Sequence, residues 1–135
     1  MNLLAISINH RTAPVELREA LFLKEDEARS FIKLARENIF KEGLILSTCN
    51  RTEIFGVPEG KELNHRTIQK LLLRFKSAEN ITEEHFQKYF SRDAVKHLFS
   101  VATGIDSLLV GDNQVFKQVK DSFQIAEETS FAGYF

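Results

Sequence analysis

The segment 46–53, Leu-Ser-Thr-Cys-Asn-Arg-Thr-Glu, carries the side chains best suited to chemistry. Cys49 is the single cysteine of the chain, and it stands where an apolar stretch gives way to polar residues. The nucleophilic form of cysteine is the thiolate, which a cationic neighbour favours. Arg51 is such a neighbour, and its planar guanidinium also suits a substrate carboxylate. If the chain stays extended here, we expect Cys49 and Arg51 to project to one face and Thr48 and Asn50 to the other.

A lone cysteine also has a plainer interpretation as a small buried hydrophobic residue, and composition alone leaves both open. Several other thiol chemistries are excluded. No second cysteine is present to form a dithiol pair, a disulfide or a cysteine-rich zinc cage. A phosphatase loop requires arginine six residues after the cysteine, where this chain has Phe55. The six glycines never occur as Gly-x-Gly, so the sequence predicts no nicotinamide site in this chain.

Four histidines are candidate partners for the thiol. His97 borders the apolar face of a predicted helix, and a half-buried imidazole there is suited to general acid–base catalysis. The alternative is a histidine at the edge of the core, bonded to a backbone carbonyl. His10 follows the first predicted strand, and we expect His65 and His85 at the surface. No pair has metal-ligand spacing on one element, so the sequence predicts no metal site.

Periodicity predicts the elements that must position these residues. Short apolar runs predict strands at 3–8, 43–47 and 52–58, with an edge strand within 82–90. Helical spacing predicts a helix start at 12–18 and helices at about 25–40, 64–76, 91–103 and 113–128. This order indicates an α+β fold, a split-βαβ (ferredoxin-like) sandwich with additional C-terminal helices.

Composition narrows the class of protein further. The 135 residues are 43% hydrophobic and 27% charged, which is typical of one soluble globular domain. No apolar run approaches the roughly 20 residues needed to span a bilayer, and no signal peptide is evident, so we expect a cytoplasmic protein. The net charge of −1 excludes a strongly basic nucleic-acid coat. Arg66, Lys70 and Arg74, however, form a basic stripe that suits either phosphate contacts or a solvated face.

Several segments together resemble the glutamyl-tRNA reductase family. Residues 6–19, which include Asn9-His10-Arg11-Thr12-Ala13-Pro14, resemble its opening motif. Segment 46–53 resembles its catalytic-cysteine motif, and 94–108 is similar to its third block, which 118–120 continues. Three motifs in this order cover most of the chain and are more specific than any one of them. One departure is the run Gly-Asp-Asn-Gln-Val at 111–115, where the family usually reads Gly-Glu-Pro-Gln-Ile.

The resemblance implies that residues 1–135 are the N-terminal catalytic domain of an oxidoreductase. That enzyme converts the glutamate of glutamyl-tRNA to glutamate-1-semialdehyde with NADPH, the first step of five-carbon tetrapyrrole and haem biosynthesis. Cys49 would be the nucleophile that forms a thioester, with His97 beside it as acid, base or orienting group. The resemblance assigns the substrate pocket to Thr48, Arg51, Ser107, Asp112, Gln114 and Gln118.

The resemblance also implies that the chain is a fragment, with NADPH-binding and dimerisation domains beyond it. NADPH would then be bound outside this chain. The implied partners are glutamyl-tRNA, a second copy in a homodimer, and an aminomutase that takes the semialdehyde. Two other interpretations stay open. One is a non-catalytic module that binds tRNA or a regulator through the basic stripe, and the other is a structural domain in which Cys49 is buried and inert.

Overall fold

The computed structural model describes residues 2–60, 63–104 and 113–133. Its elements are, in order, β1 (Leu4–Asn9), α1 (Val15–Leu21), α2 (Glu25–Asn38), β2 (Phe40–Thr48), β3 (Arg51–Pro58), α3 (His65–Phe75), a 3-10 turn (Glu83–His85), β4 (Gln87–Phe90), α4 (Arg92–Ala102) and α5 (Asn113–Glu128). The predicted strands and helices are confirmed, and only the last four residues of 82–90 form the predicted edge strand. The prediction for α2 was wrong at its end, because Phe40 begins β2 instead of extending the helix.

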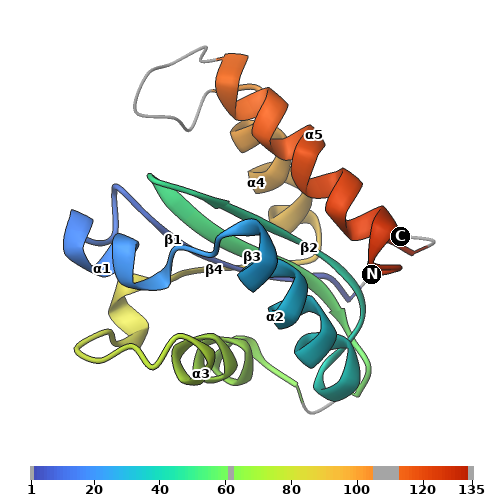
Figure 1. Cartoon of the computed structure of the whole chain (residues 1–135), viewed down its shortest axis with the longest axis horizontal. Helices are drawn as coiled ribbons and strands as arrows, with labels where there is room; N and C mark the ends of the chain where they lie inside the picture. Colours follow the sequence, from blue (N-terminus) through green and yellow to red (C-terminus); the bar gives the residue numbers. More distant parts are fainter. Residues whose placement is uncertain (1, 61–62, 105–112, 134–135) are drawn as a thin grey trace.

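The four strands form one antiparallel sheet in the order β2-β3-β1-β4. The predicted α+β class is therefore confirmed. In Figure 1, α2 and α3 lie on one side of the sheet, and α4 lies on the other, next to α5. Helices thus cover both faces of β1, and every residue of this central strand is buried. This explains its nearly continuous apolar sequence.

Alternation along β1 divides the interior into two cores. Leu4, Ile6 and Ile8 belong to the larger core, which α2 and α3 cover. Ala5 points the other way, into a smaller core with Phe55 and α4. This smaller core is apolar near the start of β1 and becomes polar toward Asn9, where buried side chains capable of chemistry are found.

The C-terminal helix is attached to the edge of the sheet by the residues that follow it. Ser130 takes a left-handed conformation with φ of 58°, which turns the chain out of α5. The next residue, Phe131, is fully buried, and its carbonyl accepts a hydrogen bond of 2.8 Å from the Gly43 amide of β2. A Cβ at Gly43 would come within 2.6 Å of the Phe131 ring, so glycine is required for this close approach.

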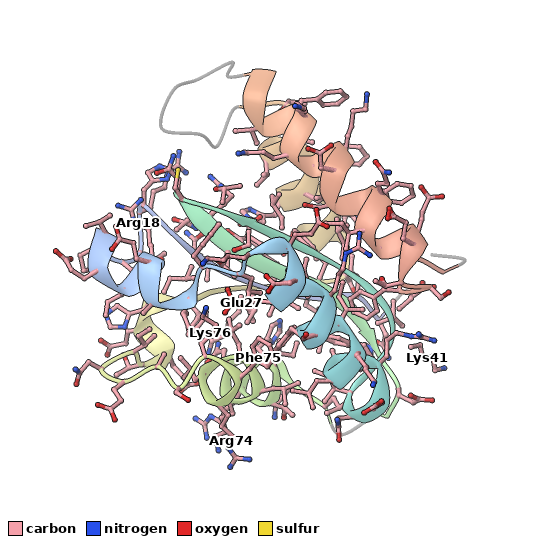
Figure 2. All side chains as sticks on the ribbon, viewed as in Figure 1. Arg18, Glu27, Lys41, Arg74, Phe75 and Lys76 are labelled. Carbon is pink, nitrogen blue, oxygen red and sulfur yellow. The ribbon has the colours of Figure 1, made fainter. Side chains whose placement is uncertain are left out.

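An ion pair joins the two helices of the larger core. Lys76, just after α3, extends toward Glu27 of α2 (Figure 2), and its Nζ lies 2.7 Å from Glu27 Oε2. The hydrogen bond from Lys76, with a second from the Lys24 amide, holds the pKa of Glu27 below its usual value. Within the described ranges no helix has the length and apolar character to cross a bilayer.

Candidate active site

Cys49 lies at the tip of the β2–β3 hairpin. Thr48 pairs with Arg51 across the two strands, so Cys49 and Asn50 alone form the turn. The prediction of an extended chain was wrong here, because the chain reverses within two residues. Since cross-strand partners share a face, Arg51 lies on the side of Thr48. The Cys49 side chain is exposed, which excludes the interpretation of a buried hydrophobic residue and a structural domain with a buried thiol.

Two segments that are far apart in sequence meet at this hairpin. The last residue of β1, Asn9, pairs with Arg51, which places the end of β1 beside the start of β3. Arg18 of α1 donates from Nη1 to Asn50 Oδ1 at 3.3 Å. Figure 2 shows Arg18 at the end of the sheet that carries this turn. The opening segment 6–19 and the cysteine segment 46–53 therefore build one structural unit.

A buried polar cluster lies below the turn, centred on the carboxylate of Glu53. This side chain is fully buried, and its Oε2 accepts three contacts. Arg51 Nη1 lies 3.2 Å away, His97 Nε2 lies 2.5 Å away, and Ser7 Oγ donates a short hydrogen bond. Glu53 Oε1 is buried and makes no hydrogen bond with any described residue. Because a buried carboxylate is stable only when it is paired, Arg51 and Glu53 have to be considered together.

Aromatic rings hold the His97 imidazole from its faces. The ring stacks on Tyr89 with centroids 4.1 Å apart and an interplanar angle of 13°. Phe55 lies at 6.3 Å with an angle of 26°. His97 is only 7% exposed, so the prediction that it borders the core is confirmed. The alternative of a backbone carbonyl partner was wrong, because its Nε2 is bonded to Glu53.

A hydrogen-bond chain connects this cluster to the edge strand. Asn9 Nδ2 donates to Ser7 Oγ at 2.8 Å and to Gln87 Oε1 at 2.9 Å. The Tyr89 hydroxyl donates to the same Gln87 oxygen at 3.0 Å. Side chains from β1, β3, β4 and α4 thus converge on one face of the sheet. This network of buried hydrogen bonds restricts the imidazole of His97 and the guanidinium of Arg51 to one orientation each, whereas side chains at the surface are free to move.

The structure places the predicted substrate-binding residues in different parts of the fold. Arg51 is 3% exposed and lies in the cluster with His97, whereas Thr48 is half-buried at the end of β2. Gln118 lies on α5 and lines a cavity of about 200 Å³ with Ser47 of β2. Ser107 and Asp112 lie outside the described residues. Gln114 belongs to α5, but its side chain also lies outside the described part.

The remaining histidines and the basic stripe have structural contacts. His65 Nε2 lies 2.7 Å from the Tyr89 carbonyl, and His85 Nδ1 accepts from the Thr82 amide at 3.0 Å. Both side chains have intermediate exposure, so they lie at the surface, as predicted, but are partly covered by these contacts. In the stripe, the Arg66 guanidinium contacts both carboxylate oxygens of Glu83, at 3.3 and 3.0 Å. This pairing favours a structural role for Arg66.

A second cavity, of about 250 Å³, lies between α4, α5 and the sheet. Its lining is largely apolar and includes Leu44, Phe55, Val57, Leu98 and Phe123. An apolar lining offers few hydrogen-bond partners to a charged ligand. The polar chemistry is therefore at the hairpin end of the sheet.

Sequence reasoning missed Glu53 and Ser7. A signal was present in the spacing of Arg51 and Glu53, because residues two apart on a strand share a face. Ser7 is likewise a polar residue within an otherwise apolar strand. What the sequence does not supply is that α4 brings His97, 44 residues away, onto the same carboxylate. Among the described residues, no three His, Cys, Asp or Glu side chains are grouped so that they could hold a metal ion.

Together these features define an α+β domain with an exposed cysteine on a hairpin turn and a buried carboxylate–imidazole–guanidinium cluster beneath it. The family model described as glutamyl-tRNA(Glu) reductase, N-terminal domain, matches residues 6–135. The chain belongs to this family.

Individual relatives agree with this assignment. The chain is 38% identical to a glutamyl-tRNA reductase of Chlorobium phaeobacteroides (strain BS1) and 40% identical to one of Pelodictyon phaeoclathratiforme. Each match covers 98% of this chain and 32% of the relative, so the chain spans about a third of their length. The solved structure of glutamyl-tRNA reductase from Methanopyrus kandleri has the same fold, with a TM-score of 0.79 at 24% identity, over 98% of this chain and 30% of that one.

Proposed function

We propose that this chain forms the cysteinyl thioester in the reduction of glutamyl-tRNA, with Cys49 as the nucleophile. The observation that carries the proposal is the exposed thiol on a two-residue turn between two paired strands. The strands fix the position of the sulfur, while the turn leaves it accessible to a large substrate such as tRNA. The family match over residues 6–135 supports the choice of substrate.

In the proposed step the Cys49 thiolate attacks the carbonyl carbon of the aminoacyl ester. A carbon–sulfur bond forms, the carbon–oxygen bond to the terminal ribose breaks, and the ribose oxygen takes up a proton. The products are a glutamyl thioester and uncharged tRNA, with no change in oxidation state. A thioester accepts hydride more readily than a carboxylate does, because its carbonyl is less stabilised by resonance. The step therefore prepares the substrate for reduction to the aldehyde.

The described residues of this chain do not fit a nicotinamide dinucleotide. Such a cofactor requires glycines in the turn before a helix, where the backbone approaches the pyrophosphate. Gly43 and Gly56 lie inside β2 and β3, where the rings of Phe131 and Phe40 fill the space beside them, and Gly60 is the single glycine between β3 and α3 rather than one of a closely spaced set. We therefore propose that NADPH is bound elsewhere in the enzyme and that this chain contributes the thioester alone.

The substrate pocket is also a proposal. Thr48, Ser107, Asp112, Gln114 and Gln118 are proposed to contact the glutamyl group, and Arg51 to bind its side-chain carboxylate. His97 is proposed to take or return the proton of the thiol.

The wider setting is a proposal that rests on the resemblance to the glutamyl-tRNA reductase family. We propose a cytoplasmic homodimer in tetrapyrrole biosynthesis, whose semialdehyde product passes to an aminomutase. We also infer that the fold is a split-βαβ, ferredoxin-like sandwich. The strand order β2-β3-β1-β4, with helices between β1 and β2 and between β3 and β4, supports this inference.

The test of the proposed function is to incubate the chain with glutamyl-tRNA and to measure tRNA deacylation and the mass of the protein. We expect deacylation and a glutamyl adduct on Cys49, and we expect Cys49→Ser to abolish both. As a matched control, the double variant Ser47→Cys/Cys49→Ser moves the thiol two residues back into β2. Equal deacylation by Cys49→Ser or by the relocated thiol would contradict the proposal.

A further inference from the structure

The fully buried Glu53 has no role in the chemistry derived above, although three side chains converge on one of its oxygens. A buried carboxylate is costly unless its partners satisfy it, so such an arrangement requires a reason. Arg51 supplies the compensating charge. The charges of these two groups cancel, and a neutral imidazole can complete the cluster without adding charge to the interior.

A carboxylate constrains the imidazole that it contacts. Because an ionised carboxylate only accepts hydrogen bonds, the His97 nitrogen at 2.5 Å from Glu53 has to carry a proton. In the neutral ring Nδ1 is then the basic nitrogen. The stacking of His97 on Tyr89 restricts tilting of the imidazole out of its plane. The tautomer and the orientation of the ring are thus fixed by different neighbours.

We propose that Glu53, held in place by Ser7, is a positioning residue that fixes the His97 tautomer with Nδ1 as the proton acceptor and orders Arg51 at the base of the cysteine hairpin. The proposal rests on the proposed function, because it assigns the shared carboxylate to the thioester-forming site. Ser7 is itself fixed by Asn9, which also bonds Gln87, so β1 and β4 both support the carboxylate. Glu53 touches no reacting atom in this scheme.

The first measurement uses the unaltered chain. Long-range ¹H–¹⁵N correlation spectra of ¹⁵N-histidine-labelled protein distinguish the two neutral tautomers, and His97→Gln identifies the His97 signals. We expect the proton on Nε2. This readout does not depend on catalysis, so it can fail while the proposed function stands, and it still applies if Cys49 forms no thioester.

The second measurement uses Glu53→Gln, in which a side-chain amide of similar shape can either accept from the imidazole or donate to it. We expect a mixture of tautomers and slower formation of the glutamyl thioester by at least about 10-fold, since the wrong tautomer at a carboxylate–histidine pair lowers a reaction rate strongly. Glu27→Gln is the matched control: it also removes a carboxylate from an ion pair, and we expect it to leave both readouts unchanged.

Glu53→Gln leaves the Arg51 charge buried, so this variant can fail to fold. Ser7→Ala then serves in its place, because it removes one hydrogen bond to Glu53 and leaves every charge. We expect a several-fold slower thioester formation with a folded structure. An Nδ1–H tautomer in the unaltered chain would overturn the proposal. So would an unchanged rate of thioester formation in folded Glu53→Gln, or in Ser7→Ala if Glu53→Gln does not fold.

Discussion

Individual side chains determine what the hairpin can do. The sequence indicated Cys49, Arg51 and His97 as candidate site residues. Cys49 and Arg51 follow the end of an apolar run, and His97 borders the apolar face of a predicted helix. The sequence did not identify Glu53, since nothing local reports that α4 packs over β3. It also did not place Arg51 correctly relative to Cys49. The pairing of Arg51 with Thr48 depends on a turn, and the segment lacks the Asn-Gly or Asp-Gly pair that marks two-residue hairpins.

At this scale we predict the effect of filling the space beside Gly56. A Cβ there would lie 2.5 Å from Cζ of Phe40, whose ring is buried. We expect Gly56→Ala to lower the free energy of unfolding by about 1–3 kcal/mol, as overpacking does, measured by urea denaturation. Gly60→Ala is the control, because a Cβ added at that position would meet no atom within 4 Å. Equal stability of the two variants would contradict the packing described for β3.

Elements were more predictable than contacts between them. Strand and helix periodicities differ, so β1, β3, α3, α4 and α5 could be located from apolar spacing alone. The end of α2 was misplaced because Ile39 and Phe40 continue the apolar pattern of the helix. Both are buried, and Phe40 pairs with Pro58 as the first residue of β2. Pairing with the sheet therefore decides a boundary that periodicity leaves open.

The contact between α2 and α3 leads to a prediction about pH. Because the hydrogen bond from Lys76 lowers the pKa of Glu27 in the folded state, the pair stabilises the fold at neutral pH. This stabilisation is lost as the pH falls below the unfolded value of about 4.5 and through the lowered folded value. We expect Lys76→Met to lower the free energy of unfolding at pH 7 by about 1 kcal/mol. In urea titrations at a series of pH values, the free energy of unfolding of this variant should fall less steeply toward acid pH.

Lys70→Met is the matched control for this pair, since Lys70 is an exposed lysine of α3, the helix that Lys76 follows. It should leave both the stability and its acid dependence close to those of the unaltered chain. If the two variants have the same pH profile, the Glu27–Lys76 pair does not contribute as described.

In the whole molecule, the buried charged cluster and the basic stripe lie on opposite sides of the sheet. The buried cluster lies on the face of the sheet covered by α4, whereas α3 covers the opposite face. Figure 2 shows Arg74 on the outer side of α3, directed away from the sheet. The basic stripe is thus on the other side of the sheet from the cluster. This layered architecture followed from the order of elements in the sequence, but the sides taken by α4 and α5 did not.

At the scale of the molecule we predict how α5 is retained. Phe131 is fully buried against Phe40 and Gly43, so it anchors the end of α5 to the core. We expect Phe131→Ala to lower the free energy of unfolding by about 3–5 kcal/mol and to speed hydrogen exchange of α5 amides more than those of β1. Phe116→Ala, an exposed phenylalanine of the same helix, should cost less than about 1 kcal/mol. Uniform exchange across both elements would contradict this anchoring.

The bond between Phe131 and Gly43 has a consequence for association between molecules. β2 is an outermost strand, and outermost strands offer free amide groups on which a foreign strand can grow. In this chain the Gly43 amide is already bonded to the Phe131 carbonyl, and the Phe131 ring occupies the space beside Gly43 that an added strand would need. A second chain could extend the sheet at Gly43 only after the segment that follows α5 had detached from β2. The bond between Phe131 and Gly43 therefore opposes strand-by-strand association at this edge.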